Sequence, residues 1–122
     1  MAVSSFRDLV VWQKSINLVQ EIYAVTKQLP GTESFGLSGQ LQRASVSIPS
    51  NIAEGSKRRG RADFRKFCMV AMGSAAELET QLIIVSKLYP TVSVDQALSL
   101  LTEVQKMLSV LIRQLKVSVV KS

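Results

Sequence analysis

Six basic residues crowd into ten positions of the chain and carry the most concentrated charge that the sequence offers. They are Lys57, Arg58, Arg59, Arg61, Arg65 and Lys66. Because only Asp63 opposes them, this segment holds a net +5 of the chain's formal +6. Arginine pairs with phosphate oxygens in a bidentate manner, so the segment predicts contact with a nucleic-acid backbone. A solvated basic turn and an acidic protein partner are the alternative interpretations.

Aromatic rings that could stack on bases are not available in this segment. Phe64 and Phe67 fall on the apolar stripe of a helix expected over 62–88, which turns their rings toward the core. Any nucleic-acid binding here is therefore expected to be directed mainly at phosphates.

A second group of polar residues lies in apolar surroundings. It comprises Arg43, Asn51, Glu54, Glu77 and Glu79. On a helical wheel Glu79 falls between Ala75 and Leu82, so its carboxylate needs a partner, for which Arg43 is the obvious candidate. Carboxylates in helical bundles can also bind metals, but such sites normally add histidines, and the chain has none. We therefore expect a structural hydrogen-bonded network, and no catalytic residue, metal or cofactor.

The size and composition of the chain fit a single domain, 1–122. Its 122 residues are 47% hydrophobic, which is too apolar for disorder and rich for a small monomer. The single cysteine, Cys68, excludes a disulfide framework within the chain and is expected to be a buried small side chain. The polar start and the short apolar runs predict a cytoplasmic protein that is not embedded in a membrane.

Apolar periodicity predicts four helices, at about 6–29, 37–56, 62–88 and 94–118. Short connections between them predict an all-α, antiparallel up-and-down four-helix bundle. Pro49 lies within the apolar stripe of the second helix. Because proline removes one backbone hydrogen bond, we expect a kink near Pro49, with the Ser45 or Ser50 hydroxyl satisfying freed backbone groups.

Two of these helices, 6–29 and 62–88, are apolar over more of their circumference than one packing seam requires. In a four-helix monomer every helix keeps an outer face in water. The excess therefore predicts that the chain associates with copies of itself.

Three blocks of the sequence are similar to those of a known family. They run from Phe6 to Lys14 (FRDLVVWQK), from Arg43 to Gly55 (RASVSIPSNIAEG) and from Gly73 to Leu82 (GSAAELETQL). Over nearly its whole length the chain resembles the bacterial four helix bundle family, also called the 23S rRNA intervening-sequence proteins. The matching positions are Arg43, Pro49, Asn51, Glu54, Gly55, Gly73, Ser74, Glu77, Glu79 and Gln81.

The resemblance implies a four-helix up-and-down subunit that assembles into a ring-shaped homopentamer. Members are encoded in insertions within rRNA genes or stand free in bacterial genomes, and the family has no established enzymatic activity. They are also similar to the accessory bundle protein of diversity-generating retroelements, which binds nucleic acid and a reverse transcriptase.

Two functional hypotheses follow. The leading one is a non-enzymatic, oligomeric helical-bundle protein that binds RNA or DNA backbone through the basic 57–66 segment. The alternative is a protein-interaction scaffold that organises a protein partner without direct nucleic-acid contact. An enzyme would need a pocket containing Glu54 or Glu79 with a strongly raised pKa, or a bound metal.

Overall fold

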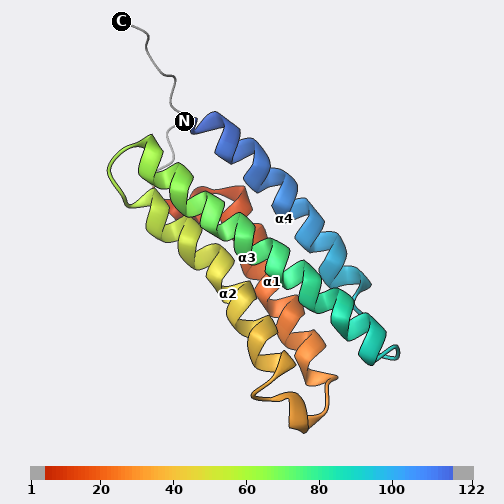
Figure 1. Ribbon diagram of the computed structural model, residues 1–122. Helices are drawn as coiled ribbons and strands as arrows, with labels where there is room; N and C mark the ends of the chain where they lie inside the picture. The colour runs from red at the N-terminus through yellow and green to blue at the C-terminus, as the bar shows by residue number, and fades with distance from the viewer. Residues whose placement is uncertain (1–4, 117–122) are drawn as a thin grey trace, which may run out of the picture.

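The computed structural model describes residues 5–116, which form an antiparallel bundle of α-helices (Figure 1). The helices are α1 (Val10–Lys27), α2 (Leu37–Ser56), α3 (Arg61–Leu88) and α4 (Asp95–Gln114). Two short 3-10 helices, η1 (Phe6–Asp8) and η2 (Gly31–Glu33), precede α1 and α2. Each helix packs against the next one in the chain and α4 packs back on α1, so the predicted all-α up-and-down bundle is confirmed.

The core is built from the apolar stripe that each helix turns inward. The largest fully buried side chains include Leu18 and Ile22 on α1, Leu41, Ile48 and Ile52 on α2, Leu78, Leu82 and Val85 on α3, and Leu101, Val104 and Leu108 on α4. Within each helix these positions are three, four or seven residues apart, which is the spacing of residues on one helical face. Burial of these side chains is the main term that stabilises the bundle.

The first helix is divided, contrary to the prediction of one helix over 6–29. Leu9 has an extended backbone (φ −75°, ψ 123°) and separates η1 from α1. The Ser5 hydroxyl accepts a hydrogen bond of 3.2 Å from the backbone N–H of Arg7, so it caps η1 and not α1. The break allows Phe6 to pack edge-on against Trp12, with 5.2 Å between the ring centroids.

The other helix ends differ from prediction by smaller amounts. α1 ends at Lys27, and Gln28 donates its backbone N–H to the last turn, so the helix stops two residues before the predicted 29. α3 begins one residue earlier than expected, at Arg61. α4 ends at Gln114, and positions 117 and 118 of the helix expected over 94–118 lie outside the described residues.

α2 continues through Pro49 without interruption and has the bounds that the sequence predicts. The Ser45 hydroxyl donates to the carbonyl of Gln42 at 2.9 Å, and the Asn51 side-chain amide donates to the carbonyl of Ser47 at 2.8 Å. Both bonds go to carbonyls other than that of Ser45, from which Pro49 removes the intrahelical donor. The kink near Pro49 stays a prediction.

Small residues let α2 and α3 approach each other closely. Gly55 is buried, and a Cβ at this position would lie 2.7 Å from Phe67 Cβ and 3.0 Å from Phe64 Cδ1. Farther along the pair, the hydroxyls of Ser47 and Ser74 share a hydrogen bond of 2.7 Å between the helices. Because Gly55 lies two residues before Lys57, this close contact between α2 and α3 is next to the start of the basic segment.

α3 leaves part of its apolar surface in water. Over its most apolar 18 residues it has a mean hydropathy of 1.4, and among the described helices it alone meets the length and composition of a membrane span. Core helices pass the same test, and α3 packs against both α2 and α4. Its outer side nevertheless shows Met69 and Val70, each 50% exposed, and Ile84, 39% exposed. The broad apolar surface predicted for this helix is present.

Candidate nucleic-acid interface

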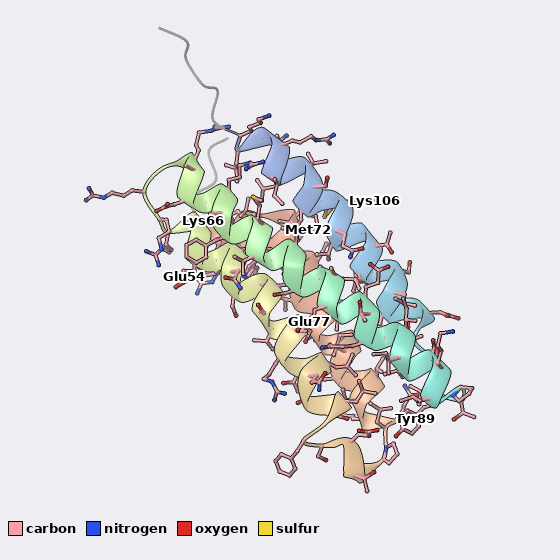
Figure 2. All side chains as sticks on the ribbon, in the orientation of Figure 1. Glu54, Lys66, Met72, Glu77, Tyr89 and Lys106 are labelled. Carbon is pink, nitrogen blue, oxygen red and sulfur yellow. The ribbon has the colours of Figure 1, made fainter. Side chains whose placement is uncertain are left out.

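The basic 57–66 segment forms one end of the bundle. It comprises the residues that follow α2, the turn, and the first turns of α3. Because α2 and α4 run in the same direction, α4 ends beside this turn (Figure 1). Figure 2 shows Glu54 and Lys66 at this end of the molecule and Tyr89 at the other.

Three basic residues that are distant in the sequence join the segment here. Arg7 lies on η1, which contacts α2, and Arg113 and Lys116 lie at the end of α4. We call the complete set the basic end: Arg7, Lys57, Arg58, Arg59, Arg61, Arg65, Lys66, Arg113 and Lys116. The acids beside them are Asp8, Glu54 and Asp63, which leaves six positive charges, equal to the chain's formal net charge of +6. Over the described residues 5–116 the remaining charges sum to −1, so the fold gathers the positive excess at one end.

Two of the predicted site residues have structural partners on α4. Arg61 donates to the backbone carbonyl of Gln114, and Arg65 Nε donates to the carbonyl of Ile112 at 3.1 Å. Carbonyls in the last turn of a helix lack intrahelical donors and carry the negative end of the helix dipole. Arg61 and Arg65 thus cap α4 and tie it to α3, which offsets the cost of placing cations at the start of α3.

Arg58 is held over the end of α2 by two weak contacts. Its guanidinium lies 5.0 Å from the ring centroid of Phe67 and 3.8 Å from the carboxylate of Glu54. Both charged side chains are at least half exposed, so the ion pair contributes little to stability. Arg58 consequently remains accessible to a stronger anion such as a phosphate.

Lys57, Arg59 and Lys66 are exposed, and within residues 5–116 their side chains make no hydrogen bond or ion pair. Arg59 precedes Gly60, whose φ of 84° is a conformation that favours glycine. That conformation reverses the chain immediately after Arg59 and leaves its side chain in water. Of the six predicted residues, these three are the most available for contact with phosphates.

The sequence contained a signal for the three residues that the prediction missed. A fourth helix that runs antiparallel to the third must end near the third helix's start. Arg113 and Lys116 are in or just beyond the last turn expected near that point, and Arg7 precedes the first helix at the same end. Counting charges by bundle end, and not by sequence window, would have found them.

The five polar residues expected to form one network are dispersed, and that prediction is wrong. Asn51 donates to Ser47 Oγ at 3.0 Å, whereas Glu54 faces Arg58. In the described part of the chain no hydrogen bond or ion pair joins any two of the set, which comprises Arg43, Asn51, Glu54, Glu77 and Glu79. The three glutamates are exposed, so water solvates their carboxylates and no buried network is required.

The pairing expected between Arg43 and Glu79 is also wrong. Glu79 lies at the edge of α3 that faces α4, where it accepts a hydrogen bond of 3.0 Å from the side-chain amide of Gln105. Arg43 lies on α2 and lines a cleft with Glu77. A helical wheel placed Glu79 beside apolar residues, but only the packed bundle shows that this edge stays exposed.

The described residues offer little for metal or nucleophilic chemistry. Among residues 5–116 no three Cys, Asp or Glu side chains come close enough together to hold a metal ion. Cys68 is buried, and desolvation raises the pKa of its thiol to about 11. A thiol that stays protonated at neutral pH is a poor nucleophile, so Cys68 packs as a small apolar side chain.

Comparison with known proteins identifies the family. The sequence profile described as "23S rRNA-intervening sequence protein" matches residues 7–111, most of the chain. The chain belongs to this family. A solved structure of a protein of unknown function from the S23 ribosomal protein family of Bacteroides thetaiotaomicron is 30% identical, with a TM-score of 0.74 over 85% of this chain and 96% of that one. No curated protein matches the chain.

Membership of the 23S rRNA-intervening sequence protein family confirms the resemblance seen in the sequence. The family name associates these proteins with RNA, and the S23 relative is described as a protein of unknown function. The matched range contains the whole 57–66 segment and Arg7. The comparisons therefore support an RNA-related role and name no reaction.

Proposed function

We infer that this 23S rRNA-intervening sequence protein is a non-enzymatic, oligomeric, cytoplasmic bundle that binds the backbone of RNA or DNA through its basic end. The observation that carries the proposal is the gathering of six net positive charges at one end, on elements that meet only in the folded chain. The family's association with RNA supports the same ligand class.

The residues of the basic end have two different roles. Lys57, Arg59 and Lys66 meet phosphates directly, since nothing else in the described chain pairs with them. Arg61 and Arg65 hold the start of α3 against α4 and so fix the surface from which the others project. Binding of this kind is driven largely by the release of counterions and carries little sequence preference.

A salt-dependent titration tests the proposal. Fluorescent duplex and single-stranded fragments of rRNA sequence are titrated with the chain at several salt concentrations. Affinity should fall steeply with salt, and the double variant Arg59→Gln, Lys66→Gln should lower the slope of log K against log salt by about one unit per lost phosphate contact. Both positions are exposed, so the fold is preserved.

A matched control separates local contacts from general charge. The double variant Lys27→Gln, Lys87→Gln also removes two positive charges, but near the opposite end of the bundle. It should leave the slope nearly unchanged. No binding at low salt, or equal losses in the two double variants, would contradict a site at the basic end.

The oligomeric part of the proposal is supported by apolar side chains that one chain leaves in water. Met69, Val70 and Ile84 are examples on α3. The family resemblance implies five subunits, and a ring would repeat the basic end and multiply weak contacts. Sedimentation of the purified chain is then expected to give a particle five times the 13.4 kDa mass of one chain.

A second candidate function is supported by a different surface. Phe35 is fully exposed, and with Tyr23 and Val46, each 42% exposed, it lines a depression of about 520 Å³ on α1 and α2. Exposed aromatic and aliphatic side chains around a hollow are typical of protein docking surfaces. A protein-interaction scaffold would use this surface.

A pull-down after nuclease treatment tests the scaffold. One stoichiometric protein that is recovered by the native chain and lost with Phe35→Ser would support it. Recovery of no protein by a chain that binds nucleic acid in the titration would reject it.

A further inference from the structure

A polar cleft between α2 and α3 contains an amide that the single chain leaves unsatisfied. Gln81 is only 6% exposed, and its Oε1 has no hydrogen-bond donor among the described residues. The cleft has a volume of about 280 Å³ and is lined by Gln40, Arg43, Ala44 and Ser47 from α2 and by Glu77 and Gln81 from α3. A buried polar atom without a partner is costly, so this cleft requires a donor from outside the chain.

The charges at the mouth of the cleft are likewise unpaired. Arg43 and Glu77 are both exposed, and no ion pair or hydrogen bond involves either side chain within residues 5–116. Figure 2 shows Glu77 midway along α3, well away from the basic end. The cleft therefore offers an acceptor, a cation and an anion to one ligand, a combination that does not suit the uniformly anionic backbone of a nucleic acid.

Apolar residues of α3 flank the cleft. On α3, residues Val70, Ile84 and Leu88 are 50%, 39% and 62% exposed, and their spacing from Gln81 places them on its side of the helix. The strip from position 70 to position 88 spans about 27 Å at 1.5 Å per residue. A small molecule that fills the cleft would leave most of this strip in water.

We propose that the α2–α3 face is a subunit contact, in which a second copy of this chain covers the apolar strip and supplies the missing donor to Gln81. This proposal rests on the oligomeric part of the proposed function and assigns the face that carries it. The face holds both signs of charge and both donors and acceptors, so a copy of the same chain can complement it. The strip is also about as long as a helix of another bundle.

The distribution of charge favours this contact. The net charge lies at the basic end, whereas the face around the cleft presents one cation, Arg43, and one anion, Glu77. Lateral packing of copies therefore buries little uncompensated charge. If neighbouring copies point the same way, their basic ends are displayed side by side, which is the arrangement that avidity requires.

The test compares self-association of the whole chain with that of three variants. Sedimentation velocity is measured over a wide range of concentrations for the native chain, Gln81→Leu, Glu77→Ala and Ile84→Ser. Gln81→Leu and Ile84→Ser should each raise the protein concentration at which half of the chains are dissociated by about tenfold or more. Each variant removes a contact from the buried part of the interface. Glu77→Ala should raise this concentration less. Gln96→Leu, an exposed amide on α4, is the matched control and should leave it unchanged.

The stability of the dissociated Gln81→Leu chain provides a second test. Leucine removes the unpaired buried oxygen, so the diluted variant should unfold at a higher denaturant concentration than the native chain while it associates more weakly. If instead a bound water satisfies Gln81 in each separate chain, association is unchanged by the substitution, and the proposal is overturned.

The outcomes separate this inference from the proposed function. An assembling chain whose variants assemble as well as the native chain refutes the α2–α3 contact alone. A native chain that remains a 13.4 kDa particle at every concentration refutes both the contact and the oligomeric part of the proposed function. Because Glu77 and Ile84 are exposed, their variants fold even if Gln81→Leu does not, and unchanged association of both would still overturn the contact.

Discussion

Gly55 and Gly73 are both helical glycines, yet replacement by alanine should change stability in opposite directions. A Cβ at position 55 would lie 2.7 Å from Phe67 Cβ, 3.0 Å from Phe64 Cδ1 and 3.3 Å from the Phe64 carbonyl. The first distance is too short for any packed interior, and the atom it meets is fixed to the α3 backbone. At Gly73 nothing lies within 4 Å of the added atom.

The magnitudes follow from these contacts. Gly55→Ala must push α2 and α3 apart, and overpacking of this kind costs about 1–3 kcal/mol. For a chain of this size that lowers the thermal midpoint by on the order of 5–15 °C. Gly73→Ala adds no clash and reduces the freedom of the unfolded chain, so it should stabilise by about 0.5–1 kcal/mol.

Denaturant unfolding followed by circular dichroism measures both changes, with sedimentation to verify that the two variants have the same association state. Gly55→Ala should also weaken nucleic-acid binding, because the displaced α3 start carries Arg61 and Arg65 away from α4. An unchanged midpoint for Gly55→Ala, or a loss at Gly73→Ala as large as that at Gly55, would refute the close approach of the two helices.

Three further predictions concern single side chains. Arg65→Ala removes the donor to the Ile112 carbonyl and should cost about 1 kcal/mol, measured by denaturant unfolding, with faster hydrogen exchange in the last turn of α4 and not in α1. Cys68, whose pKa burial raises to about 11, should resist iodoacetamide at pH 8 in the folded chain and react fully in denaturant; fast native labelling would contradict its burial. The hydrogen bond from Tyr89 Oη to Glu33 Oε2, 2.5 Å long, raises the pKa of Tyr89 above 10.0, so the stability it contributes is complete below pH 10 and is lost as pH rises through the raised pKa. In an absorbance titration the difference between the native chain and Tyr89→Phe should show the Tyr89 ionisation above pH 10, and a difference at or below pH 10 would refute the assignment.

Much of the fold could be predicted from local pattern. The inward residues of α2, for example Leu41, Ile48 and Ile52, recur at helical spacing, and the structure buries all three. The extra apolar breadth of α3 was equally visible, because it depends on composition around one helix. Leu9 could not be assigned in this way, since nothing in its neighbourhood forbids a continuous helix; in the structure the break accompanies the edge-on packing of Phe6 against Trp12.

The candidate site was predicted only in part for a related reason. The six clustered cations are a property of sequence order, and they do lie together in the structure. The separate roles of these cations do not follow from sequence order. Arg65 caps α4 through a carbonyl that lies 47 residues farther along the chain, whereas the side chain of Arg59 has no partner in the described chain. The mistaken pairing of Arg43 with Glu79 has the same cause, because a helical wheel describes one helix alone and does not show which of its edges a neighbouring helix covers.

By itself the sequence determined the helices, their inward faces and the excess of positive charge, because each of these depends on residues within a few turns of one another. Only the tertiary structure decided which cations meet at the basic end, that Gly55 lies where α2 and α3 approach closely, and that Gln81 is buried without a donor among the described residues. These features arise where helices far apart in the chain come into contact. Their energies depend on distances and burial that no single helix can specify.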